Sequence, residues 1–351
     1  MARTMQAYRL LDWEQPPQLV ETAVPRPGPG EILVKVAGNG LCHSDTAMPL
    51  IPGDMGTALG WHMPFTLGHE IAGWVDELGD GVSGLSEGEA VALISPKSCG
   101  GCWYCVRGYD SACTEGGAGR GYGRDGGLAE YVVASAPRDV IKLRTLDPVT
   151  AGPLTDAGAT SYHAVRRVLP KLAPGSMAVV IGAGGLGSFA VQFLRVLSPT
   201  RVVAVDTNPV RLSFARELGA HDVVSGVDEG TVQALRTLSG GQGAEAVLDF
   251  VGVDSTIAAG LASVRPTGSF ACVGAGGGTF KGPWYGGLPR EADVFTFQGS
   301  TIAHAHEVMA LAEAGLIRNE VDLFSLPQVA EAYEKLDRGE LRGRAVVTPG
   351  R

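Results

Sequence analysis

The sequence predicts an α/β protein built from two kinds of domain. Closely spaced short apolar runs fill roughly the first 155 residues, and β-branched runs alternate with helical patterns after about residue 157. Glycine accounts for 51 of the 351 residues, about twice its usual share of ~7%. Scattered glycines indicate many sharp turns and close backbone approaches. At about 150 residues per domain, the length favours roughly two domains.

The first part is predicted to form an antiparallel barrel or sandwich. Pro- and Gly-rich turns at residues 25–30 and 79–84 separate its apolar runs. Short strands between such turns are typical of antiparallel sheets. Strands are expected at residues 31–36, 71–75, 90–94 and 128–133.

The second part is predicted to form a parallel sheet with crossover helices. Asn208 and Pro209 have the N-cap and first-turn signature of a helix, in which Val210, Phe214 and Leu218 recur at helical spacing. Strand–helix alternation indicates βαβ units. Strands are expected at residues 177–181, 202–205, 246–250 and 269–273, and a last helix and strand at residues 329–336 and 345–348.

The charge balance excludes several partners. Lys and Arg number 28 and Asp and Glu number 37, a net charge of −9. This acidity argues against nucleic acid and anionic membrane surfaces, both of which attract basic clusters. Residues 172–194 carry no charge, but their Pro and Gly content favours strand, turn and helix over a membrane span. Residues 1–15 lack an apolar signal core, so the expected compartment is the cytoplasm.

A glycine turn follows the strand expected at residues 177–181. Gly182 suits the tight turn, Gly184 allows close approach of a pyrophosphate, and Gly187 lets the helix pack on the strand. Gly185 and Leu186 complete the G-x-G-x-x-G pattern. Asp206 ends the next strand, where a carboxylate accepts ribose hydroxyls and disfavours a 2′-phosphate. We therefore expect a Rossmann doubly wound sheet that binds NAD; the alternative is a tight turn followed by a surface aspartate.

Four of the six cysteines are concentrated in one short loop: Cys99, Cys102, Cys105 and Cys113. In a cytoplasmic chain such spacing favours a metal over disulfides. Four thiolates satisfy tetrahedral Zn²⁺ and leave no open position, which is typical of a structural site. An iron–sulfur cluster or a redox switch remains an alternative. Cys42 and His69, taken singly, fit a small buried residue and a core histidine, and Cys272 fits a core strand position.

These segments together resemble the medium-chain zinc-dependent alcohol dehydrogenases, most of all the bacterial NAD-dependent secondary-alcohol dehydrogenases. The resemblance runs along the whole chain, through GLCHSD at residues 40–45, GHE at 68–70, PLTDAG at 153–158 and LRGR at 341–344. It implies a GroES-like β-barrel catalytic domain at 1–155, with a structural zinc lobe at about 95–115. A Rossmann domain at 156–297 and a return to the catalytic domain at 298–351 complete this expectation.

The resemblance also implies the reaction and its residues. Cys42, His69 and Asp156 are expected to hold a catalytic zinc ion with one position open, and Asp45 and Glu70 to support these ligands. Hydride passes between NAD and an alcohol carbon. Ser44 is expected to pass the proton, and His43 to extend the relay or meet the pyrophosphate. The remaining contacts with NAD are expected from Thr160, Arg211, Val251, Val273, Gly274 and Arg342.

Two departures from the family pattern concern the substrate side. Ala47 stands where many relatives have a relay histidine, so the relay ends at His43, at water or at the ribose. Residues 282–291 follow no familiar pattern and border either the pocket or a subunit interface. With Ala47, the candidate pocket walls are Leu59, Trp61, Trp284 and Phe297; such an open aromatic pocket suits bulky ketones.

The expected function is oxidation of secondary alcohols or reduction of ketones, with small-molecule partners and two zinc ions per subunit. One alternative is a polyol, primary-alcohol or aldehyde dehydrogenase of the same superfamily. Another is a non-catalytic NAD-binding zinc protein. The resemblance further implies a homo-oligomer, with a tetramer favoured over a dimer.

Overall fold

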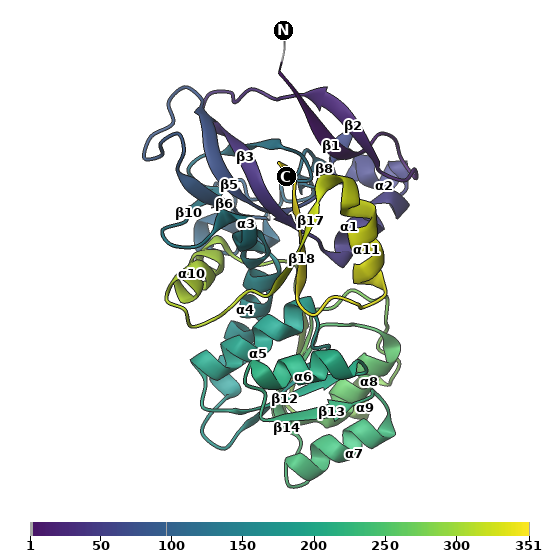
Figure 1. Ribbon diagram of the computed structural model, residues 1–351. Coiled ribbons are helices and arrows are strands. Elements are labelled where there is room, and N and C mark those ends of the chain that lie inside the picture. The colour runs from purple at the N-terminus through teal and green to yellow at the C-terminus, as the bar shows by residue number, and fades with distance from the viewer. Residues whose placement is uncertain (1–2, 96, 351) are drawn as a thin grey trace. The chain divides into compact units, whose positions relative to one another are not determined.

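A computed structural model describes residues 3–95 and 97–350 of the chain (Figure 1). The chain divides into two compact units. Residues Met1–Ala159 and Gly299–Arg351 form the first unit, and residues Thr160–Gln298 form the second.

The first unit contains a seven-stranded sheet in the order β10-β6-β5-β3-β18-β17, with β9 paired to β3. Strands β17 and β18 pair in parallel, and the other pairs in this sheet are antiparallel. The strands are β3 (Glu31–Gly40), β5 (Glu70–Leu78), β6 (Ala90–Leu93), β9 (Tyr131–Ser135), β10 (Val140–Lys142), β17 (Val321–Ser325) and β18 (Arg344–Thr348). Because β17 and β18 come from the C-terminal segment, the first unit needs both ends of the chain.

Smaller elements complete the first unit. A three-stranded sheet has the order β2-β1-β4, and β7 pairs with β8. The strands of these two sheets are β1 (Thr4–Leu10), β2 (Gln18–Ala23), β4 (Phe65–Thr66), β7 (Gly119–Arg120) and β8 (Gly123–Arg124). The helices are α1 (His43–Ala47), α2 (Gly53–Ala58), α3 (Pro148–Ala151), α10 (Ile302–Glu313) and α11 (Val329–Asp337), and α4 (Ala157–Val168) crosses the boundary between the units.

The mainly antiparallel architecture expected for the first part is confirmed, with one displaced strand. The sequence predicts a strand from residue 128, but β9 begins at Tyr131. Leu128 and Ala129 are buried by tertiary packing instead: the Leu128 N–H donates to the Leu67 carbonyl, and Ala129 forms an isolated bridge with Ala7. The apolar residues at the start of this segment are buried without belonging to a strand, so their apolar character misled the strand prediction.

The second unit is a six-stranded parallel sheet in the order β13-β12-β11-β14-β15-β16. Its strands are β11 (Met177–Ile181), β12 (Arg201–Asp206), β13 (Asp222–Ser225), β14 (Ala244–Asp249), β15 (Val264–Cys272) and β16 (Asp293–Thr296). In order of appearance this is 3-2-1-4-5-6, the Rossmann arrangement. The doubly wound sheet expected from the glycine turn is thus confirmed.

Helices follow the strands as the alternating pattern predicts. They are α5 (Gly185–Leu197), α6 (Pro209–Glu217), α7 (Glu229–Leu238), α8 (Asp254–Ser263) and α9 (Trp284–Gly287). The Asn208 side chain caps α6 by accepting the Val210 N–H. Val210 itself was expected on the apolar face but is 58% exposed, while Leu212 and Phe214 are buried. Val210 lies in the first turn of α6 and projects into solvent, so the expected apolar spacing holds only in the later turns of the helix.

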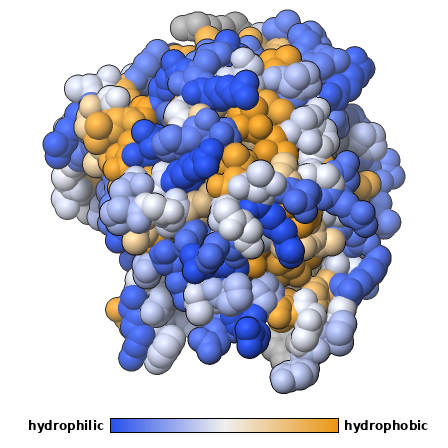
Figure 2. All heavy atoms as spheres, turned by 90° about the horizontal axis from the view of Figure 1, so that it is seen from below, coloured by the Kyte–Doolittle hydropathy of each residue, from blue (hydrophilic) through white to orange (hydrophobic). Residues whose placement is uncertain are grey.

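The uncharged stretch at residues 172–194 divides between β11, the glycine turn and α5. Within residues 3–95 and 97–350, no helix has the length and hydrophobicity needed to span a bilayer. On the face shown in Figure 2, hydrophobic patches are interspersed among hydrophilic side chains.

The backbone conformation of Thr267 in β15 should lower the stability of the folded protein. Its φ of 70° lies in the left-handed region, where a β-branched side chain is strained. Thr267→Asn should raise the free energy of unfolding by about 1 kcal/mol, because asparagine tolerates this conformation better. Thermal unfolding of the variant measures the gain, with the exposed helical change Thr237→Asn as control. Equal melting temperatures for the wild type and Thr267→Asn would show that the strain is negligible.

Candidate functional site

Four potential metal donors converge in the first unit: Cys42, His69, Glu70 and Asp156. One donor atom from each lies within 4.8 Å of those of the other three. His69 and Glu70 are buried, whereas Cys42 and Asp156 are partly exposed. The structure thus brings together all three catalytic zinc ligands expected from the sequence, although they are separated by up to 114 positions in the chain (156 − 42).

Local backbone geometry presents these side chains. Cys42 occupies the N-cap of α1, and Asp156 lies between the short η4 helix (Gly152–Thr155) and α4. His69 directly precedes β5 and follows Gly68, whose φ is +93°. A Cβ at Gly68 would lie 2.6 Å from the Asn39 side chain. Glycine is therefore needed to admit the turn that aims His69 inward.

Asp45 joins two of the donors. Its carboxylate accepts the Cys42 backbone N–H at 3.0 Å, and its other oxygen lies 3.0 Å from His69 Nδ1. When Nδ1–H donates to this carboxylate, Nε2 keeps a lone pair for a metal. Nε2 faces Asp156 Oδ2 at 3.3 Å. Burial lowers the pKa of His69, but the surrounding Tyr122, Asp45 and Asp156 outweigh it and hold that pKa well above its ordinary value.

Glu70 forms a buried ion pair with Arg344, whose side chain is 4% exposed. The other Glu70 oxygen, Oε2, is buried and has no hydrogen-bond partner among the described residues. Burial raises the pKa of Glu70 despite the opposing Arg344 charge. Sequence reasoning selected Arg342 from the LRGR segment, and that residue is exposed. The role of Arg344 was missed because nothing in the local pattern distinguishes two arginines that are two positions apart.

Ser44 and Tyr122 add two hydroxyl groups to the cluster. Ser44 Oγ lies 2.9 Å from Tyr122 Oη, which lies 3.2 Å from His69 Nε2. Burial is the largest cause that raises the pKa of Tyr122 above its ordinary value. Sequence reasoning missed this tyrosine. The sequence did offer a signal for it: in Gly121-Tyr122-Gly123 the two flanking glycines indicate a tight turn that holds the tyrosine side chain in one position.

Other residues expected near the substrate lie outside this cluster. His43 is exposed, with Nε2 3.9 Å from Asp337 Oδ1. Ala47 and Leu59 are exposed. Trp61 is 6% exposed and packs edge-on against Phe65 in the core.

Three further candidates lie in the second unit. Phe297 is partly buried and contacts the His163 ring, with 4.6 Å between ring centroids. The side chain of Trp284 lies outside the described part of the structure. Thr160 is buried on α4. Cys272, expected in the core, is only partly buried at the end of β15.

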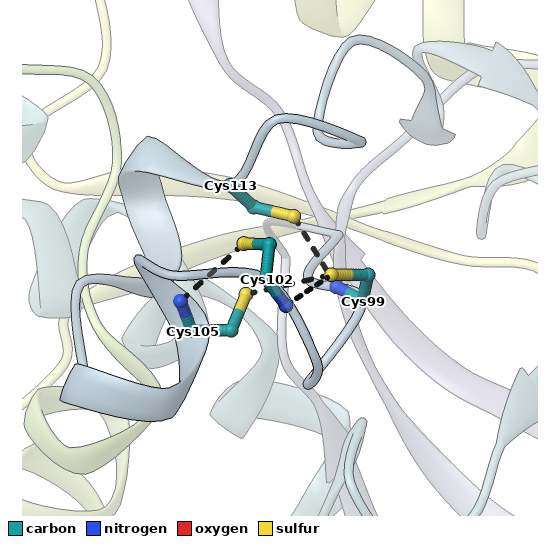
Figure 3. A group of neighbouring side chains, drawn as sticks. All are labelled: Cys99, Cys102, Cys105 and Cys113. Atoms are coloured by element: carbon teal, nitrogen blue, oxygen red, sulfur yellow. Dashed lines mark hydrogen bonds between the residues drawn. The ribbon is translucent and has the colours of Figure 1, made fainter.

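The four clustered cysteines point toward one another in the first unit (Figure 3). Their donor sulfurs lie within 4.8 Å of one another, with Cys99 Sγ and Cys105 Sγ 4.0 Å apart. A tetrahedral site with Zn–S bonds near ~2.3 Å requires sulfur separations of about 3.8 Å. The separation therefore suits a single ion, and it is about twice the length of a disulfide bond.

Backbone N–H groups surround these sulfurs. Cys102 N–H donates to Cys99 Sγ, and Cys99 N–H donates to Cys113 Sγ, both at 3.3 Å. Such bonds stabilise thiolates. Backbone N–H donation from Cys105 and Thr114 lowers the pKa of Cys102 to about 6, whereas burial raises that of Cys105 to about 11. A closed set of four sulfurs fits a structural zinc ion, and the mixed thiolate, imidazole and carboxylate set fits a catalytic one.

The glycine turn of the second unit has the geometry of a phosphate cradle. Gly182 has φ +85°, and a Cβ on Gly187 would lie 1.9 Å from the Gly182 carbonyl. The nearest atoms to a Cβ on Gly184 would be those of the Arg211 guanidinium, at 3.7 Å. The space above Gly184 is thus open beside a positive charge, at the N-terminus of α5. These are the three glycine roles that dinucleotide binding needs.

Asp206 and Arg211 flank this turn. The Asp206 carboxylate accepts the Ala183 and Asn208 N–H groups, each at 2.8 Å. Arg211 Nε is buried without a hydrogen-bond partner among the described residues. Asp206 therefore fixes the turn and the start of α6. The Arg211 guanidinium, which lies beside Gly184, has an N–H group available to donate to a bound phosphate.

Asp249, at the end of β14, was not singled out from the sequence. Its carboxylate accepts the N–H groups of Val251 and Gly252 at 2.9 and 3.0 Å, and its carbonyl accepts those of Val273 and Gly274 at 2.8 and 2.9 Å. One residue thus ties together the two strand-end loops that contain Val251, Val273 and Gly274. An acidic residue ending an apolar strand was the available signal.

Comparison with known families and structures agrees with this geometry. Residues 28–145 match the alcohol dehydrogenase GroES-like domain, and residues 185–314 match the zinc-binding dehydrogenase family. The GroES-like barrel expected for the first part is thereby confirmed. An NAD-dependent alcohol dehydrogenase from Sulfurisphaera tokodaii is 34% identical, over 98% of this chain and 100% of that protein.

Solved structures give the same result. The alcohol dehydrogenase of Aeropyrum pernix superposes with a TM-score of 0.89 at 34% identity, covering 98% of this chain and 100% of that one. Acetophenone reductase from Geotrichum candidum, in complex with NAD, has a TM-score of 0.87 at 28% identity, covering 99% and 97%. The relatives named here do not distinguish the expected bacterial subgroup. The chain belongs to the family of medium-chain zinc-binding alcohol dehydrogenases.

Proposed function

We propose that the protein is an NAD-dependent zinc alcohol dehydrogenase that interconverts secondary alcohols and ketones. The observation that carries this proposal is the convergence of Cys42, His69 and Asp156 beside the Ser44 hydroxyl. A purely structural metal site needs no open position and no neighbouring hydroxyl. The named relatives are alcohol dehydrogenases and a ketone reductase, which supports the same reaction class.

Bound zinc would supply Lewis acidity to the substrate oxygen, and bound NAD would accept or donate the hydride. Cys42, His69 and Asp156 would hold the metal, and Asp45 would orient His69 by accepting its Nδ1 proton. In alcohol oxidation NAD⁺, when bound, would take up the hydride from the carbon, and the oxygen would give up a proton. Ser44 Oγ accepts that proton and passes its own outward, so the net products are ketone, NADH and H⁺.

The outward end of the proton path differs from the usual family pattern at Ala47. His43 lies one residue before Ser44 in the chain and is exposed to solvent. It is therefore a candidate end of the relay, with water or the nicotinamide ribose as the other two.

Ser44→Ala should lower kcat by roughly 100-fold or more, the lower range for losing a proton-transfer group. Affinity for NAD should fall far less than kcat, because the hydrogen-bond partner of Ser44 Oγ is Tyr122. Steady-state kinetics with NAD titrations checks both values. Thr46→Ala is the matched control, since its hydroxyl donates to the His43 carbonyl on the same helix. Intact turnover in Ser44→Ala would refute this proton route.

Cofactor preference is assigned to Asp206. A buried carboxylate at the end of β12 suits ribose hydroxyls and repels a 2′-phosphate. Arg211 would contact the adenosine half and Arg342 the pyrophosphate; Thr160, Val251, Val273 and Gly274 would surround the nicotinamide.

Asp206→Gly should lower the preference for NAD over NADP by roughly 10- to 100-fold, since a hydrogen bond to a charged group contributes about 1.5–3 kcal/mol. Dissociation constants for both cofactors measure the change. Thr207→Ala, at the exposed neighbouring position, should leave the preference intact. An unaltered ratio in Asp206→Gly would mean that the carboxylate serves only the Ala183 and Asn208 N–H groups.

Assembly and compartment extend the proposal. Strand β16 ends the parallel sheet, and Val294 on it is 45% exposed. An exposed edge strand can pair with a second copy of the chain. We therefore propose a homo-oligomer, tetramer before dimer, in the cytoplasm. Light scattering after size-exclusion chromatography measures the subunit number, and a monomer would overturn this part.

NADH formation from NAD⁺ across secondary, primary and polyol alcohols tests the function directly. Chelator-sensitive turnover concentrated on secondary alcohols is the expected result. Preference for primary alcohols or polyols would assign the protein to another branch of the family. NAD and zinc binding without turnover on any substrate would favour a binding protein instead.

A further inference from the structure

We propose that Tyr122 is a positioning residue for Ser44: its phenolic O–H donates to Ser44 Oγ, so that in the ketone complex the Ser44 proton is left to face the substrate oxygen. This inference rests on the proposed function and adds a second hydroxyl to it.

The contacts of Tyr122 place it within the donor cluster. Its Oη lies 2.9 Å from Ser44 Oγ and 3.2 Å from His69 Nε2. Its ring packs against the His69 ring with 4.7 Å between centroids. Among the described residues, Ser44 and His69 are the hydrogen-bond partners of this hydroxyl.

The surrounding turn holds the tyrosine in place. Gly121 and Gly123 have φ of +74° and +76°, a conformation that favours glycine. A Cβ on Gly121 would lie 2.7 Å from the Gly68 carbonyl oxygen, directly before His69. A Cβ on Gly123 would lie 2.3 Å from the Trp61 ring. The turn therefore packs against the backbone that presents His69, with its one side chain directed at the cluster.

Counting protons gives the direction of the bond between the two hydroxyls. When a metal is bound, His69 Nε2 gives its lone pair to the ion, and Nδ1 is the ring nitrogen that keeps a proton for the Asp45 carboxylate. With that lone pair in use, Ser44 Oγ is the acceptor left for the Tyr122 O–H. Each hydroxyl has a single proton to donate. If Tyr122 donates to Ser44, the Ser44 proton is free for the substrate oxygen, whereas without Tyr122 the serine hydroxyl rotates freely.

Binding and kinetics of Tyr122→Phe, Ser44→Ala and the double variant test this coupling. The first measurement is the dissociation constant of an unreactive carboxamide, whose oxygen mimics that of the ketone, in the presence of NADH. Tyr122→Phe should weaken binding by about 3- to 10-fold, the effect of one lost hydrogen bond. The same change in the Ser44→Ala background should have no further effect. Values of kcat should follow the same pattern.

Two controls separate positioning from a structural role. Tyr122→Phe should keep the zinc content and melting temperature of the wild type, because the ring is retained. Tyr131→Phe removes a hydroxyl whose partner is Arg3 rather than a residue of the donor cluster, and it should match the wild type in zinc content, carboxamide binding and kcat.

Three outcomes would overturn the inference: multiplicative effects in the double variant, wild-type binding by Tyr122→Phe, or loss of zinc in that variant. The proposed function fails separately, if the wild type turns over no alcohol at all. In that case the carboxamide measurement still reports whether Tyr122 and Ser44 act as one unit.

Discussion

Asp156→Asn should remove one of two bound zinc ions and leave the other in place. The carboxylate contributes a negative charge and a metal donor 3.3 Å from His69 Nε2, and a neutral amide is a poor substitute. The four cysteine sulfurs form their own separate group. Activity should fall by more than the roughly 100-fold typical of losing a ligand's supporting partner. Elemental analysis after gel filtration, paired with turnover, measures both effects.

Asp54→Asn is the matched control for this change, because Asp54 is exposed on α2. It should retain both ions and full activity. Loss of both ions in Asp156→Asn would show that the two sites are not independent. Retention of both would show that Asp156 is not a ligand and that Glu70, the fourth clustered donor, deserves the same test.

Arg344→Met should be the most destabilising of the substitutions considered. It leaves the Glu70 carboxylate buried without its cation, and breaking a buried pair in this way costs about 3–5 kcal/mol. Both partners are almost completely buried, at 4% and 0% side-chain exposure. Thermal and denaturant unfolding of the zinc-loaded protein should show the loss as a lower melting temperature and midpoint.

Arg338→Met provides the comparison on the surface. Arg338 pairs with Glu334 at 2.9 Å, but both side chains are more than 60% exposed. Removing such a pair should change stability by no more than about 1 kcal/mol. Equal losses for the two variants would contradict the argument that burial sets the cost at Arg344.

Much of the fold was predictable because its signals are local. The strand at residues 177–181 and the cap at Asn208 appear as expected, since β-branched runs and capping side chains act through their immediate neighbours. Residues 128–130 and Val210 were misjudged for the opposite reason. Whether an apolar residue joins a ladder or faces solvent depends on the elements that pack against it.

The candidate site shows the same division. The four cysteines are close in sequence, so their spacing alone predicted one metal site. Cys42, His69 and Asp156 carry no such spacing, and only the family resemblance suggested them together. The structure places them within reach of one another, because α1, β5 and α4 all begin at the same place in the first unit.

By itself, the sequence determined the two-part architecture, the cysteine cluster and the glycine turn, each carried by residues within a few positions of one another. Only the tertiary structure decided that Arg344 rather than Arg342 faces Glu70, that Tyr122 joins Ser44 to His69, and that Asp249 ties two loops together. These contacts join residues far apart in the chain. Their energies come from burial and hydrogen-bond geometry, which no local pattern records.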